Sequence, residues 1–429
     1  MTKPCIVERL RVSSAFSFRD TMTRSVLLLN PLLLGLAVTL AQVGIAVFLL
    51  APEGPLWYRY SSLVQHDSYW FANIIERGYQ TIVPPIGHKT MEISNVAFFP
   101  AYPAIAAVLR YGLRIETDKA LLVTAQAATV GFWSYFFLFC QKWDLSPTLR
   151  FFGALSILAH PAAFFLVAGY SESLFLMAVV GFIYWAGREG RAANMLAVLH
   201  GILMSATRIV GIPCAAAPLV QRICAQGWEA LRRPREWVRL YGRAIALTIV
   251  ATIGAVSFFL YCQLRWGHWD IYMLTQSSGW AISPDYLAVF RPSSYRWVVP
   301  ALNDPTAMSQ MSVTTGALFF IFVAACELVP AIRRSTNWPV RISLYFCAAI
   351  IFYISVSGVA SVAMESMVRY HFAVHALIVL ALLHFLRQFT RPPVYVRALG
   401  MAAVALASVA GLTLQGWYIW NFTRGNWVA

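Results

Sequence analysis

The sequence predicts an all-α polytopic membrane protein with about 11 transmembrane helices, and three observations support this prediction. Charged residues are only 12% of the 429 positions and hydrophobic residues are 59%, whereas a soluble domain is about one-quarter charged. Apolar runs long enough to cross about 30 Å of hydrocarbon recur along the whole chain. Basic residues gather in short clusters between these runs, as they do in the cytoplasmic loops of membrane proteins.

Nine apolar runs are clear predictions for membrane-crossing helices: residues 25–50, 120–141, 151–168, 172–187, 243–262, 313–332, 342–359, 370–386 and 396–418. No interval between them is long enough to form a soluble core, so we expect residues 1–429 to form a single transmembrane domain. The net charge of +15 suits anionic lipid headgroups and the control of topology. We therefore predict membrane lipids as partners and no nucleic acid.

Two further apolar segments are ambiguous. Residues 96–113 form a short run with two prolines, and residues 193–221 form a long run interrupted at Arg208. If the first stays outside the bilayer core and the second forms two half-helices, 21 of the 33 Lys and Arg residues are cytoplasmic, as the positive-inside rule requires. Reversing both assignments gives a similar charge count, but segment length favours the first arrangement. In that arrangement the two long loops, 51–119 and 263–312, are external, and juxtamembrane helices lie in the first of them.

The first external loop contains a candidate catalytic carboxylate, Asp67, in the string His66-Asp67-Ser68-Tyr69-Trp70. The apolar and aromatic positions that follow have helical spacing, which predicts an amphipathic helix on the membrane surface with Asp67 at its N-terminus. Asp67 has two interpretations. It is either a helix cap or a general base held at the lipid–water boundary.

Glu172 and Arg208 each interrupt apolar sequence, and a charge at such a depth is a functional hypothesis because it is costly. Glu172 follows Tyr170-Ser171 and is also explained by helix capping, since Glu favours the first turn of a helix. Arg208 requires a partner. That partner is either an anionic ligand or a carboxylate in a purely structural ion pair with Glu172 or Asp67.

A further charged group, Glu365 with Arg369-Tyr370-His371, lies at the mouth of a predicted helix, where snorkelling Arg and interfacial Tyr are common. In the favoured topology this group shares one side of the membrane with Asp67, Glu172 and Arg208. Carboxylates beside guanidinium groups suit sugar or phosphate transfer, which needs a base for the acceptor hydroxyl and cations for the leaving phosphate.

Six strings resemble, in order and approximate spacing, the PIG-V-like mannosyltransferases, which include GPI mannosyltransferase 2 and its bacterial relatives and belong to the GT-C glycosyltransferases. The strings are His66-Asp67-Ser68-Tyr69-Trp70, Glu76-Arg77-Gly78-Tyr79, Ala97-Phe98-Phe99-Pro100-Ala101-Tyr102-Pro103, Tyr170-Ser171-Glu172-Ser173-Leu174-Phe175, Ala206-Thr207-Arg208 and Arg369-Tyr370. His66 stands where the family usually has Trp, and Ala101 where it often has Leu. These two departures bear on the identity of the acceptor more than on the class of reaction.

The resemblance implies a sugar, expected to be mannose, that moves from a polyprenyl-phosphate donor to a lipid or glycan acceptor on the external or lumenal face. In that family an Asp of the first external loop acts at the acceptor, which corresponds to Asp67, and a second acidic position corresponds to Glu172. We predict that the donor phosphate is bound by Arg208, Arg369, Lys89 and His88. We predict that further substrate contacts come from His66, Tyr69, Trp70, Tyr170, Tyr370 and Glu365.

Several alternatives remain open at this stage. Two isolated carboxylates do not establish a divalent cation, although one bridging Asp67 or Glu172 to the phosphate is compatible with them. Broken helices and intramembrane charge also suit a secondary transporter or lipid flippase, and a noncatalytic subunit of a glycosylation complex is a third interpretation. The Arg- and Ala-rich composition and short chain favour a bacterial inner membrane over an endoplasmic reticulum membrane.

Overall fold

The computed structural model describes residues 18–80, 94–227, 232, 234–301, 304–328, 338–387 and 393–428. Within these ranges the regular secondary structure is helical, which confirms the predicted all-α class, whereas the number of about 11 crossings stays a prediction. Seven helical units there are long and apolar enough to cross a membrane. They are α1 (Phe18–Gly44) with η1 (Ile45–Leu50), α5 (Thr117–Lys142), α11 (Trp237–Ala251) with α12 (Ile253–Trp266), α14 (Pro305–Glu327), α16 (Trp338–Val359), α17 (Met367–Leu386) and α18 (Val394–Phe422).

Two of the nine predicted spans are short helices. One is α7 (Glu172–Ala186), and the other is α6 (Pro147–Leu158), which has 12 residues and is therefore about 18 Å long, well below the thickness of the hydrocarbon. The prediction of one continuous helix over 151–168 is wrong. Pro161 disfavours helical backbone at the residue before it, and the chain continues as the separate turn η4 (Ala163–Leu166).

The ambiguous segment 96–113 forms η3 (Asn95–Ala97) and then α4 (Ala101–Gly112), a helix of 12 residues. At about 18 Å this helix is too short to span the bilayer. The Tyr111 hydroxyl at its end donates to the carbonyl of Ile75 over 2.9 Å, so α4 lies against the helix that contains Ile75. Its length agrees with the arrangement that keeps this segment outside the bilayer core.

The second ambiguous segment is broken at Arg208 and returns to the end from which it came. It consists of α8 (Arg191–Thr207), α9 (Gly211–Cys214) and α10 (Ala217–Gln226). Arg243 of α11 donates to the side chain of Asn194 near the start of α8 over 2.7 Å, and Arg222 near the end of α10 donates to the carbonyl of Leu240 over 2.9 Å. Both ends of the segment therefore meet α11 within one turn, as expected for two half-helices.

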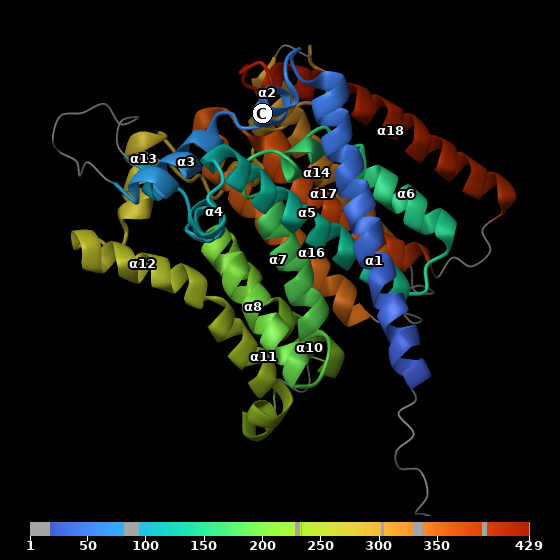
Figure 1. Cartoon of the computed structure of the whole chain (residues 1–429). Helices are drawn as coiled ribbons and strands as arrows, with labels where there is room; N and C mark the ends of the chain where they lie inside the picture. The colour runs from blue at the N-terminus through green and yellow to red at the C-terminus, as the bar shows by residue number, and fades with distance from the viewer. Residues whose placement is uncertain are drawn as a thin grey trace, which may run out of the picture.

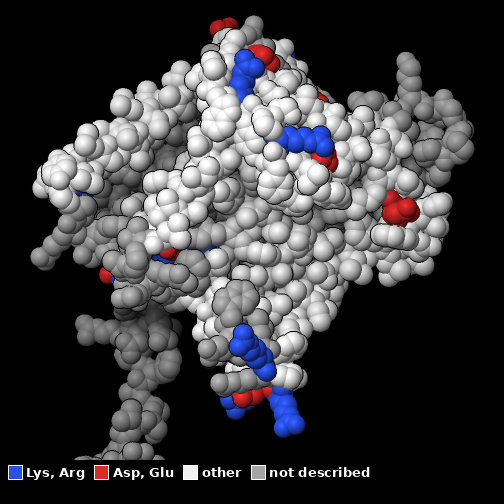
Figure 2. Space-filling model, turned by 180° about the vertical axis from the view of Figure 1, so that it is seen from behind, with Lys and Arg blue, Asp and Glu red and all other residues white. Residues whose placement is uncertain are grey.

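Buried and peripheral helices differ sharply. In α17, 83% of the apolar window is buried within the protein, whereas in α18 only 11% is buried. Figure 1 shows α17 among α5, α7, α14 and α16, with α18 and α1 outside them. Near the end that holds the C-terminus, α3 (Asp67–Arg77), α4 and α13 (Ile271–Gly279) lie together. The face in Figure 2 is mostly uncharged, as a lipid-facing surface requires. The two helices that carry Glu172 and Arg369 in their first turns, α7 and α17, therefore lie in the buried interior of the protein.

Candidate active site

Four of the predicted residues, from four helices, lie in one alternating chain of charges. Asp67 is the first residue of α3 (Asp67–Arg77), Glu172 is the first residue of α7, Arg208 follows the last residue of α8, and Arg369 is in the first turn of α17. Asp67 Oδ2 lies 2.5 Å from Arg369 Nη1, and Arg369 Nε lies 3.3 Å from Glu172 Oε1. Arg208 Nη2 donates to the same Glu172 oxygen. We call these four residues the outer charge chain.

The two ends of the outer charge chain keep exposed surface, and its middle is buried. The side chains of Asp67 and Arg208 are each 22% exposed, whereas those of Arg369 and Glu172 are each 5% exposed. Because a buried charge is costly unless it is paired, the inner residues are stabilised by each other and by the end residues. The chain therefore presents a carboxylate at one end and a guanidinium at the other.

Helix ends explain why these charges are tolerated here. Glu172 lies at the N-terminus of α7 and Arg208 at the C-terminus of α8, where the helix dipoles favour a negative and a positive charge respectively. The Asp67 side chain binds Arg369, and no side-chain cap hydrogen bond is found at the N-terminus of the described α3. Capping alone therefore does not account for Asp67. The structural interpretation of Arg208, a pair with Glu172, is found, although Arg208 also keeps exposed surface.

Aromatic rings surround the guanidinium groups. The Arg369 guanidinium carbon lies 5.2 Å from the ring centres of both Tyr170 and Tyr370 and 5.7 Å from that of Phe165. Arg208 lies 5.4 Å from the Tyr370 ring. Such cation–π contacts stabilise a desolvated cation. The backbone N–H of Asp67 donates to the Tyr170 hydroxyl over 3.3 Å, so two of the three predicted tyrosines, Tyr170 and Tyr370, contact the outer charge chain.

The other predicted residues lie around this centre or outside it. Trp70 stacks on Phe98 with ring centres 6.0 Å apart and meets the edge of Trp280 at 5.5 Å. Tyr69 is exposed and donates to Gln65, and Glu365 is exposed on the turn before α17. His66 contacts the C-terminal segment. His88 and Lys89 lie outside the residues that the structure describes.

The end of α3 opposite Asp67 is fixed by the contacts of Glu76 with Arg110 and Thr117, which we call the strut. Arg110 Nε of α4 lies 3.3 Å from Glu76 Oε1, and the Thr117 hydroxyl donates to the same oxygen. The hydrogen bond from Thr117, with a smaller contribution from Arg110, lowers the pKa of the Glu76 carboxyl. Thus α3, which carries Asp67 at one end, is tied to α4 and α5 at the other.

Sequence reasoning missed several residues that contact the site. Ser171 Oγ accepts from Arg208 Nε over 3.4 Å, and Phe165 covers Arg369. In the sequence, Phe165 belongs to an apolar run and gives no signal that it contacts a cation. Within the described ranges, no group of three or more His, Cys, Asp or Glu side chains is arranged to hold a metal ion.

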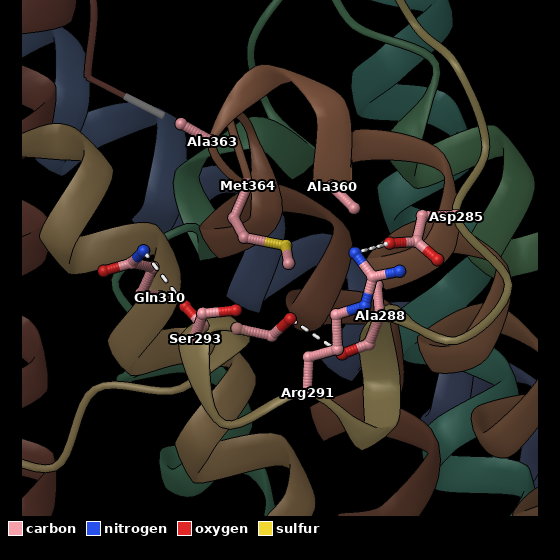
Figure 3. Close-up of a pocket in the computed structure, with 9 residues that line it drawn as sticks. Asp285, Ala288, Arg291, Ser293, Gln310, Ala360, Ala363 and Met364 are labelled. Carbon is pink, nitrogen blue, oxygen red and sulfur yellow. Dashed lines mark hydrogen bonds and ion pairs between the residues drawn. The ribbon is translucent and has the colours of Figure 1, made fainter.

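A separate polar pocket of about 100 Å³ joins the later external loop to the turn before α17. Its side chains are shown in Figure 3, where Arg291 Nη1 pairs with Asp285 Oδ2 at 2.6 Å and Gln310 donates to the carbonyl of Ser293 over 3.5 Å. Met364 forms part of the wall. The loop that was predicted over 263–312 therefore contacts the turn that leads into Arg369.

Comparison with solved structures shows likeness to two membrane proteins. ArnT from Cupriavidus metallidurans, solved bound to undecaprenyl phosphate, matches with a TM-score of 0.50 and 13% sequence identity over 88% of this chain and 63% of that one. The archaeal oligosaccharyltransferase AglB from Archaeoglobus fulgidus, in complex with an inhibitory peptide and a dolichol-phosphate, matches with a TM-score of 0.48 and 11% identity over 94% of this chain and 56% of that one. This chain thus spans less than two thirds of the length of either. No known protein family and no curated protein matches its sequence.

At this level of identity the likeness concerns the fold. The apolar helices make this chain a multi-pass integral membrane protein, as the sequence predicted, and its fold is similar to that of ArnT. The narrower resemblance to PIG-V-like mannosyltransferases has no family match behind it. It stays a prediction from the six strings.

Proposed function

We propose that this protein is a glycosyltransferase that moves a sugar from a polyprenyl-phosphate donor to an acceptor hydroxyl on the external or lumenal side of the membrane. The observation that carries the proposal is the outer charge chain, which offers solvent a carboxylate and a guanidinium from one connected cluster. The GT-C fold supports it, since ArnT with that fold was solved with undecaprenyl phosphate bound.

The exposed ends have complementary roles in this reaction. Asp67 accepts the proton of the acceptor hydroxyl while that oxygen forms a bond to the anomeric carbon of the sugar. The bond between the anomeric carbon and the phosphate oxygen breaks, and the polyprenyl phosphate leaves with the electron pair. Arg208 meets the phosphate charge as it develops, because a guanidinium matches phosphate geometry. A single displacement of this kind inverts the anomeric centre.

The buried members hold the exposed ones in place. Arg369 contacts both carboxylates, so it orients Asp67 and adds positive charge behind the phosphate site. Glu172 Oε1 accepts a hydrogen bond from Arg208 and forms an ion pair with Arg369 Nε at 3.3 Å, so it fixes the distance between the two arginines. We assign His88 and Lys89 as further candidates for phosphate binding from the first external loop.

Mannose is the sugar that we propose, and a bacterial inner membrane is the location. The support for mannose is the resemblance to PIG-V-like enzymes in the strings that contain Asp67, Glu172, Arg208 and Arg369. The acceptor is a lipid or glycan, since the exposed end of the chain lies at an external loop near the membrane surface.

The test is the purified Asp67→Asn protein, assayed for transfer of labelled mannose from polyprenyl-phosphate mannose to lipid and glycan extracts of the host membrane. Losing the base lowers the rate by roughly 100-fold to 10,000-fold. Glu76→Gln is the matched control, because it removes a carboxylate from the same helix at the opposite end and leaves transfer near the wild-type rate. An unchanged rate of transfer in the Asp67→Asn protein would exclude Asp67 as the general base.

A lipid flippase or secondary transporter is the second candidate, and the half-helices that meet at Arg208 favour it, since transporters use such breaks at their binding sites. The purified chain in sealed liposomes separates the two functions. A transferase forms labelled product from donor and acceptor on one side. A flippase moves the intact polyprenyl-phosphate sugar across the bilayer and forms no product.

A further inference from the structure

His66, the residue before Asp67, has a backbone conformation that non-glycine residues rarely adopt. Its φ is 48° and its ψ is −109°. A residue keeps such a conformation only where its surroundings hold it there, and these positions cluster at functional sites. Because Asp67 is the next residue, the conformation of His66 sets the direction in which the Asp67 backbone leaves the loop and enters α3.

The last residue of α18 and the segment that follows it, residues 422–427, hold the His66 side chain. His66 Nε2 lies 3.2 Å from the carbonyl oxygen of Asn426, so this nitrogen carries the hydrogen and donates. The Trp427 ring meets the imidazole edge to face at 5.0 Å between ring centres, and Phe422 lies 5.8 Å away. Three contacts from one short segment thus fix one imidazole.

The segment is itself anchored. Arg424 Nη1 donates to the carbonyl of Leu50 over 3.2 Å and to that of Trp420 over 2.8 Å. Gly425 has a φ of 81°, and its amide donates to the carbonyl of Phe422 over 2.9 Å. Glycine is suited to this turn because it adopts positive φ without a steric penalty.

Phe422 also reaches the partner of Asp67. Its ring centre lies 5.6 Å from that of Phe165 and 5.8 Å from that of Tyr170, and both of those rings cover the Arg369 guanidinium. The same C-terminal segment therefore packs against the residue before Asp67 and against the rings that hold Arg369.

We propose that residues 422–427 form a positioning clamp that fixes the Asp67 carboxylate, acting through His66 on its backbone and through Phe422 on Arg369. The clamp rests on the proposed function for its catalytic consequence. Its structural effect can be measured without any assay of transfer. His66 is thus a positioning residue in this proposal and makes no contact with the reacting atoms.

The structural test is hydrogen–deuterium exchange of the full-length protein at the amides of Ser68 and Tyr69, which are bonded to the carbonyls of Gln65 and His66. Trp427→Ala and His66→Ala each accelerate exchange there by roughly tenfold or more, since local opening becomes easier. Gly425→Ala disturbs the turn but keeps the Phe422 and Trp427 side chains, and it also accelerates exchange at these two amides. Wild-type exchange in all three variants would overturn the clamp.

The matched control is Trp57→Ala, which removes an exposed tryptophan, 62% accessible, from the same external loop. Its ring packs against Tyr58, and exchange at Ser68 and Tyr69 stays at the wild-type rate. Faster exchange in this control as well would overturn a specific role for the C-terminal segment.

The catalytic test is the mannose transfer assay, separated into kcat and KM. Because misplacing a catalytic group by about 1 Å costs up to roughly 100-fold, His66→Ala and Trp427→Ala lower kcat by about tenfold to 100-fold and leave the donor KM unchanged. His66→Gln, whose amide can still donate to Asn426, recovers most of the rate. A changed KM with unchanged kcat would overturn the positioning role. Faster exchange in the variants, with no transfer by the wild-type protein, would retain the clamp and reject the transferase.

Discussion

The outer charge chain and a second buried ion pair, at the other end of the helices, show two different uses of charge. In the second pair Arg341 Nε lies 2.7 Å from Glu327 Oε1, and Arg341 Nη2 lies 2.8 Å from Glu327 Oε2. Tyr345 donates to the same carboxylate over 3.2 Å. The side chains of Arg341 and Glu327 are 0% and 9% exposed. We call this the inner pair.

The inner pair is closed and the outer charge chain is open. Both oxygens of Glu327 accept from one guanidinium, a geometry that satisfies the carboxylate fully. In the outer charge chain, Glu172 Oε2 is buried without a hydrogen-bond partner in the described part of the chain, and the two end residues keep exposed surface. A closed pair stabilises helix packing, whereas an open chain keeps groups available to a ligand.

The largest expected effect comes from replacing each pair with apolar residues of similar size. The double variant Glu172→Leu/Arg208→Met lowers the rate of transfer by about 1,000-fold or more, because it removes the electrostatic support for the leaving phosphate. Arg341→Met/Glu327→Leu retains folding and transfer, since apolar replacements of a closed buried pair are often neutral. Transfer rates of the two purified variants, measured side by side, check this. Equal losses in both would remove the distinction.

Breaking the inner pair on one side has the next largest effect. Glu327→Gln leaves the Arg341 guanidinium buried without its carboxylate and lowers the free energy of unfolding by about 3 to 5 kcal/mol. The rate per folded molecule stays near wild type. Thermal unfolding in detergent, followed by the transfer assay on the folded fraction, measures both quantities. A selective loss of transfer without lower stability would contradict a structural role.

Arg208→Lys has a moderate effect at the exposed end of the outer charge chain. Lysine keeps the positive charge but cannot contact phosphate and Glu172 as a planar fork. We expect transfer to fall by about tenfold, with stability close to wild type because Arg208 is partly exposed. Kinetics at varied donor concentration check this, and wild-type kinetics would show that the geometry of the guanidinium is unimportant.

The smallest expected effect is at the strut. The pKa of Glu76 is lowered in the folded protein, so its carboxylate contributes stability above the unfolded pKa, and that contribution is lost as the pH falls from about 4.5 through the folded pKa. Glu76→Gln therefore lowers Tm slightly at pH 7, and the difference from wild type shrinks toward pH 3. Melting curves at both pH values test this, and a difference that grows on acidification would have the wrong sign.

Sequence reasoning succeeded where local chemistry decides the structure. The break at Arg208, the start of α3 at Asp67 and the short helix within 96–113 were all predicted, because helix ends, charge and segment length act locally. The predicted membrane topology then placed four charged residues on one side of the membrane: Asp67, Glu172, Arg208 and Arg369. In the structure these four side chains contact one another in the outer charge chain, which agrees with that prediction. Their catalytic roles stay proposals.

The features that were missed depend on how helices rotate against each other. Arg341 directly precedes the predicted span 342–359 and Glu327 lies within the predicted span 313–332, with no pattern to show that the two side chains meet. The contact of Asn426 with His66 joins residues 360 positions apart, which no local periodicity encodes. The end of α6 before Pro161 was within reach of sequence reasoning, since the restriction on the residue before proline is local.

The length of α18 has a consequence for the membrane around the protein. With 29 residues, this helix is about 43 Å long, whereas the hydrocarbon is about 30 Å thick. Its apolar run, residues 396–418, is about 34 Å long and spans the hydrocarbon with some tilt, whereas its neighbour α6, at about 18 Å, is shorter than the hydrocarbon is thick. The acyl chain length of the reconstituted bilayer thus becomes a variable that acts on the helix whose end contacts His66.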